Sequence, residues 1–409
     1  MIACPFIAAG HPFERAMDEI RRALENRPAW ARPEERSGRM VRQHELKGVR
    51  DGQGAWRLDR FYSSTLSWDR SSSPFFDAVT YHYAGKPGSG QWFRFPEDPR
   101  LGALEHLAEA RDPEVLQYVV LRRLTYRAKT AQGGAYIGKF KRWSQTPRSF
   151  KVLSLVSAAA SLGRLSFRIP APLRVDASRH LFHQEALPGQ PVSELVNGAT
   201  LDALLHAMGR IHAELHGLAV PGVPVAAAQA SIDALSRDCD WIAFFRPADG
   251  ARLASVRRVL LHVLPRLSPA APVLCHGDFV CSHVLHGPEG SAVVDFDLAH
   301  RADPHADAAI LLSSLTHDVP FLRRAIRDPG AAPEALIERG VSAYVEGYQS
   351  YGRRILDRRR LLWHRIAAEI HMLGLMFTKD RFHALAFDRR LALVESLTSE
   401  LSRAGERAA

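Results

Sequence analysis

Apolar residues recur with helical spacing through most of the second half of the chain. Between positions 201 and 215 they occur at every third or fourth residue, which is the pattern of one buried helix face. The members of this series are Leu201, Leu204, Leu205, Met208, Ile211 and Leu215. We predict further helices over residues 12–26, 101–110, 149–162, 231–245, 252–264, 333–351, 359–379 and 388–404.

The first half of the chain has a different texture, with short aromatic and β-branched runs divided by Gly, Ser and Pro. Residues 56–61 and 78–83 are two such runs, and we predict strands there. Two further strand-like runs, 115–127 and 135–141, flank a Gly133-Gly134 turn, which indicates a hairpin. Short strands are also predicted over 173–176 and 180–187. The N-terminal half is therefore predicted to be strand-rich.

Length, charge and cysteine content narrow the possible functions. A chain of 409 residues is above the size at which one hydrophobic core usually divides, so we predict two or three domains. The formal charge of +10 comes mainly from scattered arginines, which argues against a nucleic-acid partner. Four irregularly spaced cysteines form no disulfide framework, and neither a signal peptide nor a membrane-length apolar run is present. We predict a cytoplasmic protein without a membrane partner, and the oligomeric state stays open.

The segment from Val273 to Asp297 contains the most chemical information. An apolar run leads into His276-Gly277-Asp278; after a loop, a short apolar run, 284–285, and a further run, 292–294, flank a turn, and the last run ends on Asp295-Phe296-Asp297. A turn over 286–290 would fold the runs 284–285 and 292–294 together and place Asp278 and Asp295 at the same end of one ribbon. Phosphoryl transfer needs two such carboxylates, because one orients the acceptor hydroxyl and takes its proton while another holds Mg²⁺.

These motifs resemble those of a known family. His276-Gly277-Asp278 with position 283, and Asp295-Phe296-Asp297, are similar to the H-G-D-x-x-x-x-N and D-F/W-D/E motifs of aminoglycoside phosphotransferases and choline kinases, which are related to protein kinases. Residues 302–307 are similar to the family's G-D-P-x-x-D-L-A segment, and the likeness extends over 118–312.

The resemblance implies an α+β, bilobal protein kinase-like fold with a strand-rich N-lobe, a helical C-lobe and an extra N-terminal module. We expect the module over 1–112, comparable to the cap of maltokinase-like enzymes, the N-lobe over 113–187 and the C-lobe over 188–409. The implied activity is transfer of the γ-phosphate of ATP or GTP, with Mg²⁺, to a hydroxyl of an aminoglycoside, a sugar or an amino alcohol.

The resemblance also assigns roles to single residues. Asp278 would be the catalytic base, His276 would support its loop, and Asp307 would brace the neighbouring segment. The nucleotide would be bound by Lys139 or Lys141 at the phosphates and by the hinge 184–189, with Glu185 and Leu187, at the base. The metal-side residues would be Asp295, Asp297 and His283.

Two departures from the family pattern motivate a second hypothesis. His283 stands where the family has Asn, and imidazole suits Mg²⁺ less well than an amide oxygen. The helix predicted over 149–162 has no acidic residue to pair with the strand lysine. The alternative is a catalytically degenerate pseudokinase that binds nucleotide or a partner without turnover. A third possibility is that the basic N-terminal region recruits an acidic partner.

Other readings of the same residues are less specific. His-Gly-Asp alone could be an Asx turn, Asp303 and Asp307 could cap a helix, and Lys139 and Lys141 could lie on a solvated edge strand. A cysteine and histidine group suggests zinc, although its spacing fits no usual site: Cys275, His276, Cys281, His283 and His286. We interpret His206, His212 and His216 as surface or rim residues and not as ligands. The residues expected to line the acceptor pocket are Asp238, Asp240, Trp241, Glu369 and His371.

Overall fold

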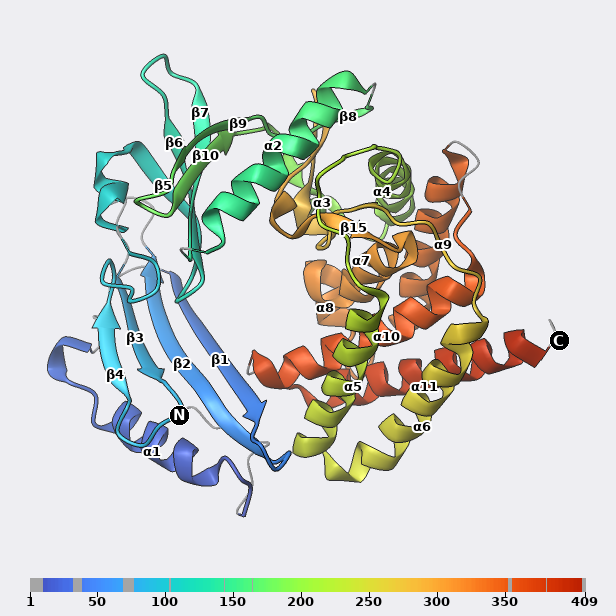
Figure 1. The fold of residues 1–409 in the computed structure, drawn as a ribbon, viewed down its shortest axis with the longest axis horizontal. Helices are drawn as coiled ribbons and strands as arrows, with labels where there is room; N and C mark the ends of the chain where they lie inside the picture. The colour runs from blue at the N-terminus through green and yellow to red at the C-terminus, as the bar shows by residue number, and fades with distance from the viewer. Residues whose placement is uncertain are drawn as a thin grey trace. The chain divides into compact units, whose positions relative to one another are not determined.

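The structure, a computed structural model, describes residues 10–31, 39–68, 77–102, 104–142, 144–163, 165–351, 355–379 and 381–406. Its contacts divide the chain into two compact units, and Figure 1 shows the elements of each. Unit 1 contains Met1–Arg148, Leu173–Ala186 and Met376–Phe382. Unit 2 contains Ser149–Pro172, Leu187–Leu375 and His383–Ala409. The chain passes from unit 1 to unit 2 between Ala186 and Leu187, within the segment predicted as a hinge.

The first sheet of unit 1 is antiparallel, with its strands in chain order. Helix α1 (Glu14–Glu25) belongs to the same unit and buries Met17 and Ile20. The strands predicted over 56–61 and 78–83 are confirmed as parts of β2 and β3. The four strands are β1 (Arg39–Arg50), β2 (Trp56–Trp68), β3 (Asp77–Tyr83) and β4 (Gln91–Arg94).

The second sheet of unit 1 has the order β5-β6-β7-β10-β9. The Gly133-Gly134 hairpin is confirmed between β6 and β7. The single run predicted over 115–127 is wrong, because residues 120–122 turn the chain and divide it into two antiparallel strands. The strands are β5 (Arg111–Val119), β6 (Arg123–Lys129), β7 (Ala135–Lys141), β9 (Pro172–Asp176) and β10 (Leu181–Glu185).

One hydrophobic core serves both sheets of unit 1. Tyr62 and Leu66 from β2 and Phe93 from β4 belong to the same buried cluster as Tyr118 and Leu124 from the second sheet. The helix predicted over 101–110 is a short 3-10 helix, Leu104–Glu109, and its leucines join this cluster. The residues of the expected N-terminal module are thus packed with the strands that follow them.

Unit 2 is mainly helical, as predicted, and also carries short strands around the His-Gly-Asp segment. The helices predicted for this unit are found within a few residues of the expected limits, while α3, α7 and α8 were not predicted. Its helices are α2 (Thr146–Leu162, in unit 2 from Ser149), α3 (Val192–Leu195), α4 (Leu201–Leu215), α5 (Ala228–Phe245), α6 (Gly250–Val263), α7 (Pro304–Asp318), α8 (Pro320–Ala325), α9 (Glu334–Ser350), α10 (Arg358–Thr378) and α11 (Ala384–Glu406).

Helices α4 and α9 approach each other closely. A Cβ atom on Gly347 of α9 would lie 1.9 Å from the carbonyl oxygen of His206 on α4, so this contact requires glycine. The close approach brings the C-terminal half of α4 against Tyr344 and Tyr348 of α9. This arrangement determines the surroundings of the His-Gly-Asp segment.

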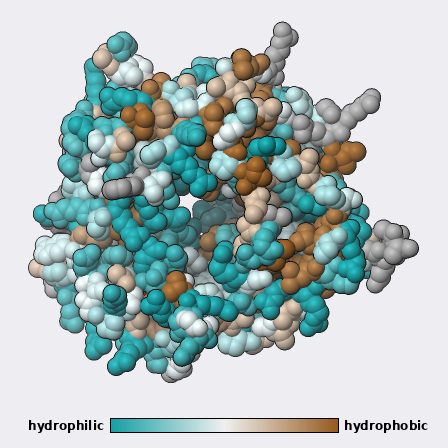
Figure 2. Space-filling view, viewed as in Figure 1, coloured by the Kyte–Doolittle hydropathy of each residue, from teal (hydrophilic) through white to brown (hydrophobic). Residues whose placement is uncertain are grey.

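Most large apolar side chains of both units lie in their interiors. The face of the molecule in Figure 2 is largely hydrophilic, and its apolar residues occur in small groups. None of the described helices has both the length and the apolar character that crossing a membrane requires.

Candidate active site

The His-Gly-Asp segment forms a loop between short strands of unit 2. Strand β12 (Val273–Cys275) precedes it, and the hairpin of β13 (Val284–Gly287) and β14 (Gly290–Val293) follows. The predicted hairpin is confirmed, with Val284 opposite Val293. Strand β12, however, pairs with β15 (His300–Ala302) and not with this hairpin. The loop over 276–283 therefore connects the β12–β15 pair to the β13–β14 hairpin, and the segment over 294–297 connects that hairpin back to β15.

His283 lies between the two aspartates that the sequence singled out. Its Nδ1–H donates to the carbonyl oxygen of Asp278 (2.8 Å), and Nδ1 is 3.7 Å from the Asp278 carboxylate. Its Nε2 atom lies 3.6 Å from Oδ2 of Asp295. The Asp278 side chain is 40% exposed, whereas those of His283 and Asp295 are 17% and 16% exposed. The base candidate is thus the most accessible of the three groups.

The backbone of this region adopts conformations that side chains rarely allow. Gly277 has φ +80°, and a Cβ atom there would lie 2.4 Å from the carbonyl oxygen of Leu298. Asp295 itself is left-handed, with φ 69° and ψ 50°, and it precedes the 3-10 turn Phe296–Leu298 that contains Asp297. Such backbone conformations cost free energy and cluster at functional sites.

His276 is fully buried and links the two parts of the site. Its Nε2–H donates to the carbonyl oxygen of Val294 (2.9 Å), next to Asp295, and its Nδ1 accepts from the N–H of Asp278 (3.3 Å). Burial, followed by the nearby His283, lowers the pKa of His276 to about 4, so the ring is neutral at pH 7. A neutral ring can donate at one nitrogen and accept at the other, as these two bonds require.

Asp307, on the first turns of α7, holds the start of the loop. Its carboxylate accepts from the backbone N–H groups of His276 (2.6 Å) and Gly277 (2.9 Å). It is not a helix cap; Asp303 has that role, as predicted, by accepting from the N–H of His305. At the other end of α7, Asp318 accepts from the N–H of Ser282 (2.7 Å). Helix α7 therefore binds both ends of the loop.

Two histidines of α4 complete this arrangement, and their interpretation as surface residues is wrong. His212 and His216 are buried, and their Nε2 atoms lie 2.9 and 3.3 Å from Oδ2 of Asp307. Their Nδ1 atoms are hydrogen-bonded to the hydroxyls of Tyr344 (2.6 Å) and Tyr348 (2.7 Å). His206, the third residue of that group, is only half-buried. The i, i+4 spacing of His212 and His216 was the available signal, since it places both on one helix face.

The charge of Asp307 is strongly stabilised. Burial alone would raise its pKa, but the hydrogen bonds from His212 and His216 outweigh this and hold the pKa well below its ordinary value. The ligand atoms of these three residues lie within 4.8 Å of one another, a spacing that could hold a metal ion. Because each of their side-chain nitrogen and oxygen atoms already has a hydrogen-bond partner, we interpret the group as a brace of the loop.

The expected nucleotide-binding lysines lie in unit 1. Lys139 and Lys141 are on β7, and both are buried. The solvated-edge alternative is wrong, because β6 and β10 flank this strand on its two sides. The Nζ atom of Lys139 is 5.8 Å from the centre of the Phe182 ring, a cation–π contact. Glu185 ends β10 at the last residue pair with β7.

The residues expected to line an acceptor pocket are mostly engaged with other side chains of unit 2. Asp238 and His371 contact each other (2.8 Å), and Arg257 donates to Asp240 (3.0 Å). Trp241 is buried, and Glu369 forms a buried ion pair with Arg390. Leu187, expected at the nucleotide base, is buried at the start of the second stretch of unit 2.

The cysteines of the described residues are free and buried. Burial raises the pKa of Cys239 to about 12 and also raises those of Cys275 and Cys281, so all three remain thiols at pH 7. Metal ligation requires thiolate, which these surroundings disfavour. Cys4 lies outside the described residues.

Comparison with known proteins identifies the family. The family model described as the phosphotransferase enzyme family matches residues 121–361, more than half of the chain. The chain belongs to this family. It is a small-molecule phosphotransferase, as the motifs around Asp278 and Asp295 predicted. No curated protein matches the chain.

Solved structures of phosphotransferases and kinases are similar to this chain. The aminoglycoside phosphotransferase APH(4)-Ia, in a ternary complex with ADP and hygromycin B, is 14% identical with a TM-score of 0.50, covering 74% of this chain and 96% of that one. Amicoumacin kinase hAmiN, in complex with AMP-PNP, Ca²⁺ and Ami, is 15% identical (TM-score 0.47; 70% and 88%). Choline kinase LicA from Streptococcus pneumoniae is 13% identical (TM-score 0.46; 72% and 96%). The first likeness confirms the predicted α+β protein kinase-like fold, strand-rich at its start and helical at its end.

Proposed function

We propose that this phosphotransferase moves the γ-phosphate of ATP or GTP to a hydroxyl of a small molecule, with Asp278 as the base. The observation that carries the proposal is the position of His283 between Asp278 and Asp295. In this role the accessible Asp278 carboxylate orients the acceptor hydroxyl and takes its proton. General bases contribute about 10²- to 10⁴-fold to such reactions.

The donor set near Asp295 fits Mg²⁺. The Nδ1–H of His283 is used by the carbonyl oxygen of Asp278, and its Nε2 atom lies 3.6 Å from the Asp295 carboxylate. Asp295 and Asp297 supply the oxygen ligands that Mg²⁺ prefers, with His283 as a weaker neighbour. When bound, the ion neutralises the charge of the phosphates.

The proposed nucleotide contacts are Lys139, with Lys141 as the second candidate, at the phosphates, and Glu185 and Leu187 near the base. Both lysines are buried on β7, the middle strand of the second sheet, where the resemblance to aminoglycoside phosphotransferases places the phosphate-binding lysine. The complexes of the similar structures with AMP-PNP and ADP also support a nucleotide donor. For the domains, we propose a nucleotide-binding part over 113–187 and a catalytic part over 188–409, preceded by the module over 1–112.

The acceptor classes are an aminoglycoside, a sugar or an amino alcohol, and they are tested by product mass. The protein is incubated with Mg²⁺, ATP or GTP, and one compound of each class. We expect an acceptor whose mass increases by one phosphoryl group, and no product with Asp295→Asn. The matched control is Asp388→Asn, which changes an exposed aspartate of α11. Nucleotide binding without any phosphorylated product would refute transfer to these three classes.

A further inference from the structure

A cavity of about 860 Å³ lies within unit 2 among helices α7, α9, α10 and α11. This volume is in the range of about 300–1,000 Å³ that is typical of small-molecule sites. Its lining residues, as far as the structure describes them, include none from 276–297. Leu312 and Thr316 of α7 contribute to its wall. The cavity therefore borders the helix that holds the loop over 276–283, but it contains no residue of that loop.

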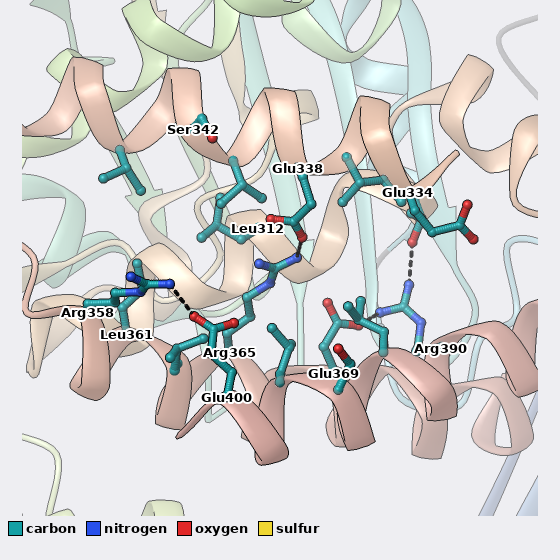
Figure 3. Close-up of a pocket in the computed structure, with 18 of the residues that line it drawn as sticks. Leu312, Glu334, Glu338, Ser342, Arg358, Leu361, Arg365, Glu369, Arg390 and Glu400 are labelled. Atoms are coloured by element: carbon teal, nitrogen blue, oxygen red, sulfur yellow. Dashed lines mark hydrogen bonds and ion pairs between the residues drawn. The ribbon is translucent and has the colours of Figure 1, made fainter. Parts of the chain in front are cut away.

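The walls of the cavity are largely apolar. Figure 3 shows side chains of α9, such as Glu338, and of α10, such as Arg365, converging on the space between these helices. An apolar body placed there would lose contact with water on several sides, at a gain of about 25 cal/mol for each Å² removed from water. The main apolar members of the wall are Leu312, Ile337, Val341, Leu361, Leu393 and Leu397.

The arginines of the wall are already engaged with protein acceptors. The Nε atoms of Arg365 and Arg390 lack an acceptor, but both are buried and are not presented to the cavity. An anionic ligand would therefore have to displace an existing ion pair or carbonyl contact. These contacts join Arg358 to Glu400 (2.6 Å), Arg365 to Glu338 (2.9 Å), Arg390 to Glu369, and Arg389 to the carbonyl oxygens of Ala325, Ile326 and Ala331.

Two glutamates of the lining have no such partner. Glu334 and Glu346, both exposed on α9, make no hydrogen bond or ion pair with any residue that the structure describes. They are 12 positions apart on one helix, which corresponds to about 18 Å at 1.5 Å per residue, so they border different parts of the opening. With five glutamates and four arginines in the lining, the charge left without a partner is negative.

We propose that this cavity binds an amphipathic amine, with its apolar body between α9, α10 and α11 and its ammonium group at Glu334 or Glu346. The apolar wall selects the body, and the engaged arginines together with the unpaired glutamates select a cationic head over an anionic one. The site is separate from the phosphotransfer centre, so its occupation does not depend on the function proposed above.

The test uses three probes with the same eight-carbon chain: octylamine, octan-1-ol and octanoate. Binding to the full-length protein is measured by titration calorimetry at pH 7. We expect saturable binding at one site, tightest for octylamine and weakest for octanoate. Octylamine has no hydroxyl, so it cannot be a phosphoryl acceptor and turnover cannot disturb the measurement. No saturable binding of octylamine, or tighter binding of octanoate, would overturn the proposal.

Variants locate the site. Val345→Trp places a large side chain in the cavity from α9 and is expected to abolish octylamine binding. Ser342→Trp places one there from an exposed position of the same helix, and it replaces the first variant if Val345→Trp lowers the unfolding temperature. The double variant Glu334→Gln, Glu346→Gln should weaken octylamine about fivefold for each charge in contact, the effect of a unit charge at about 4 Å in water, and leave octan-1-ol unchanged. Glu105→Gln, an exposed change in unit 1, is the matched control. Octylamine binding that survives both tryptophan variants would place it elsewhere and refute the inference.

Discussion

Replacing Asp307 by Asn tests the brace that holds the loop over 276–283. The carboxylate accepts from two backbone N–H groups and from two imidazoles, and it is 1% exposed. Asn has nearly the same shape but only one acceptor oxygen. The imidazoles of His212 and His216 can exchange tautomers and accept from the new NH₂ group, whereas the two backbone N–H groups cannot adapt.

The magnitude of the effect follows from this count. One of the N–H groups of His276 and Gly277 keeps an acceptor, and the other is left buried without one, which costs about 1–3 kcal/mol. The surviving bond also loses its charge assistance, which is worth about 1 kcal/mol more. We therefore expect the loop to open more easily by about 3 kcal/mol, or about 100-fold in the opening equilibrium.

Amide hydrogen exchange measures this opening directly. In Asp307→Asn the exchange of the His276 and Gly277 amides should be about 100-fold faster than in the wild type, and phosphotransfer should fall with it. The control Asp388→Asn should change neither quantity. Unchanged exchange at both amides in a folded Asp307→Asn protein would refute the brace. Equal acceleration along the whole of α4 and α7 would also contradict it, since that result indicates general destabilisation.

Three further predictions concern single side chains. Lys139→Ala should raise the KM for nucleotide at least tenfold while Lys141→Ala has a smaller effect, and the reverse order in steady-state kinetics would exchange their roles. His283→Ala should raise the Mg²⁺ concentration for half-maximal activity about tenfold, as loss of a metal-side group typically does, whereas an unchanged Mg²⁺ titration would exclude His283 from the metal site. Burial, followed by Arg174, lowers the pKa of His183 to about 4. The unfolded ring therefore binds a proton at a higher pH than the folded one, and the free energy of unfolding should fall as the pH decreases from about 6.5 to about 4. Urea unfolding measured over this pH range should show a shallower fall for His183→Gln than for the wild type.

The hairpin beside the loop over 276–283 could be predicted from the sequence because its parts are close together in the chain. Asp278, His283 and Asp295 lie within 18 positions, and a turn between two apolar runs is enough to bring them to one end of a hairpin. The Gly133-Gly134 hairpin before Lys139 was predictable for the same reason. In both cases the backbone geometry follows from local turn chemistry.

The brace could not be predicted because its partners are distant in the chain. His212 and Tyr344 are 132 positions apart, and only the close crossing of α4 and α9 brings them together. Viewed on α4 alone, a histidine beside an apolar face resembles a surface residue. The order of the second sheet, in which β10 pairs with β7 across the intervening α2, is likewise set by long-range packing.

The most direct test of the central claim compares the wild type with Asp278→Asn in Mg²⁺-dependent nucleotide turnover, with nucleotide binding measured in parallel. Asn keeps the size of the side chain and its backbone contacts but cannot take a proton. We predict that turnover falls by about 10²- to 10⁴-fold while nucleotide affinity stays within about twofold. Turnover equal to that of the wild type, with nucleotide binding intact, would contradict the assignment of Asp278 as the base.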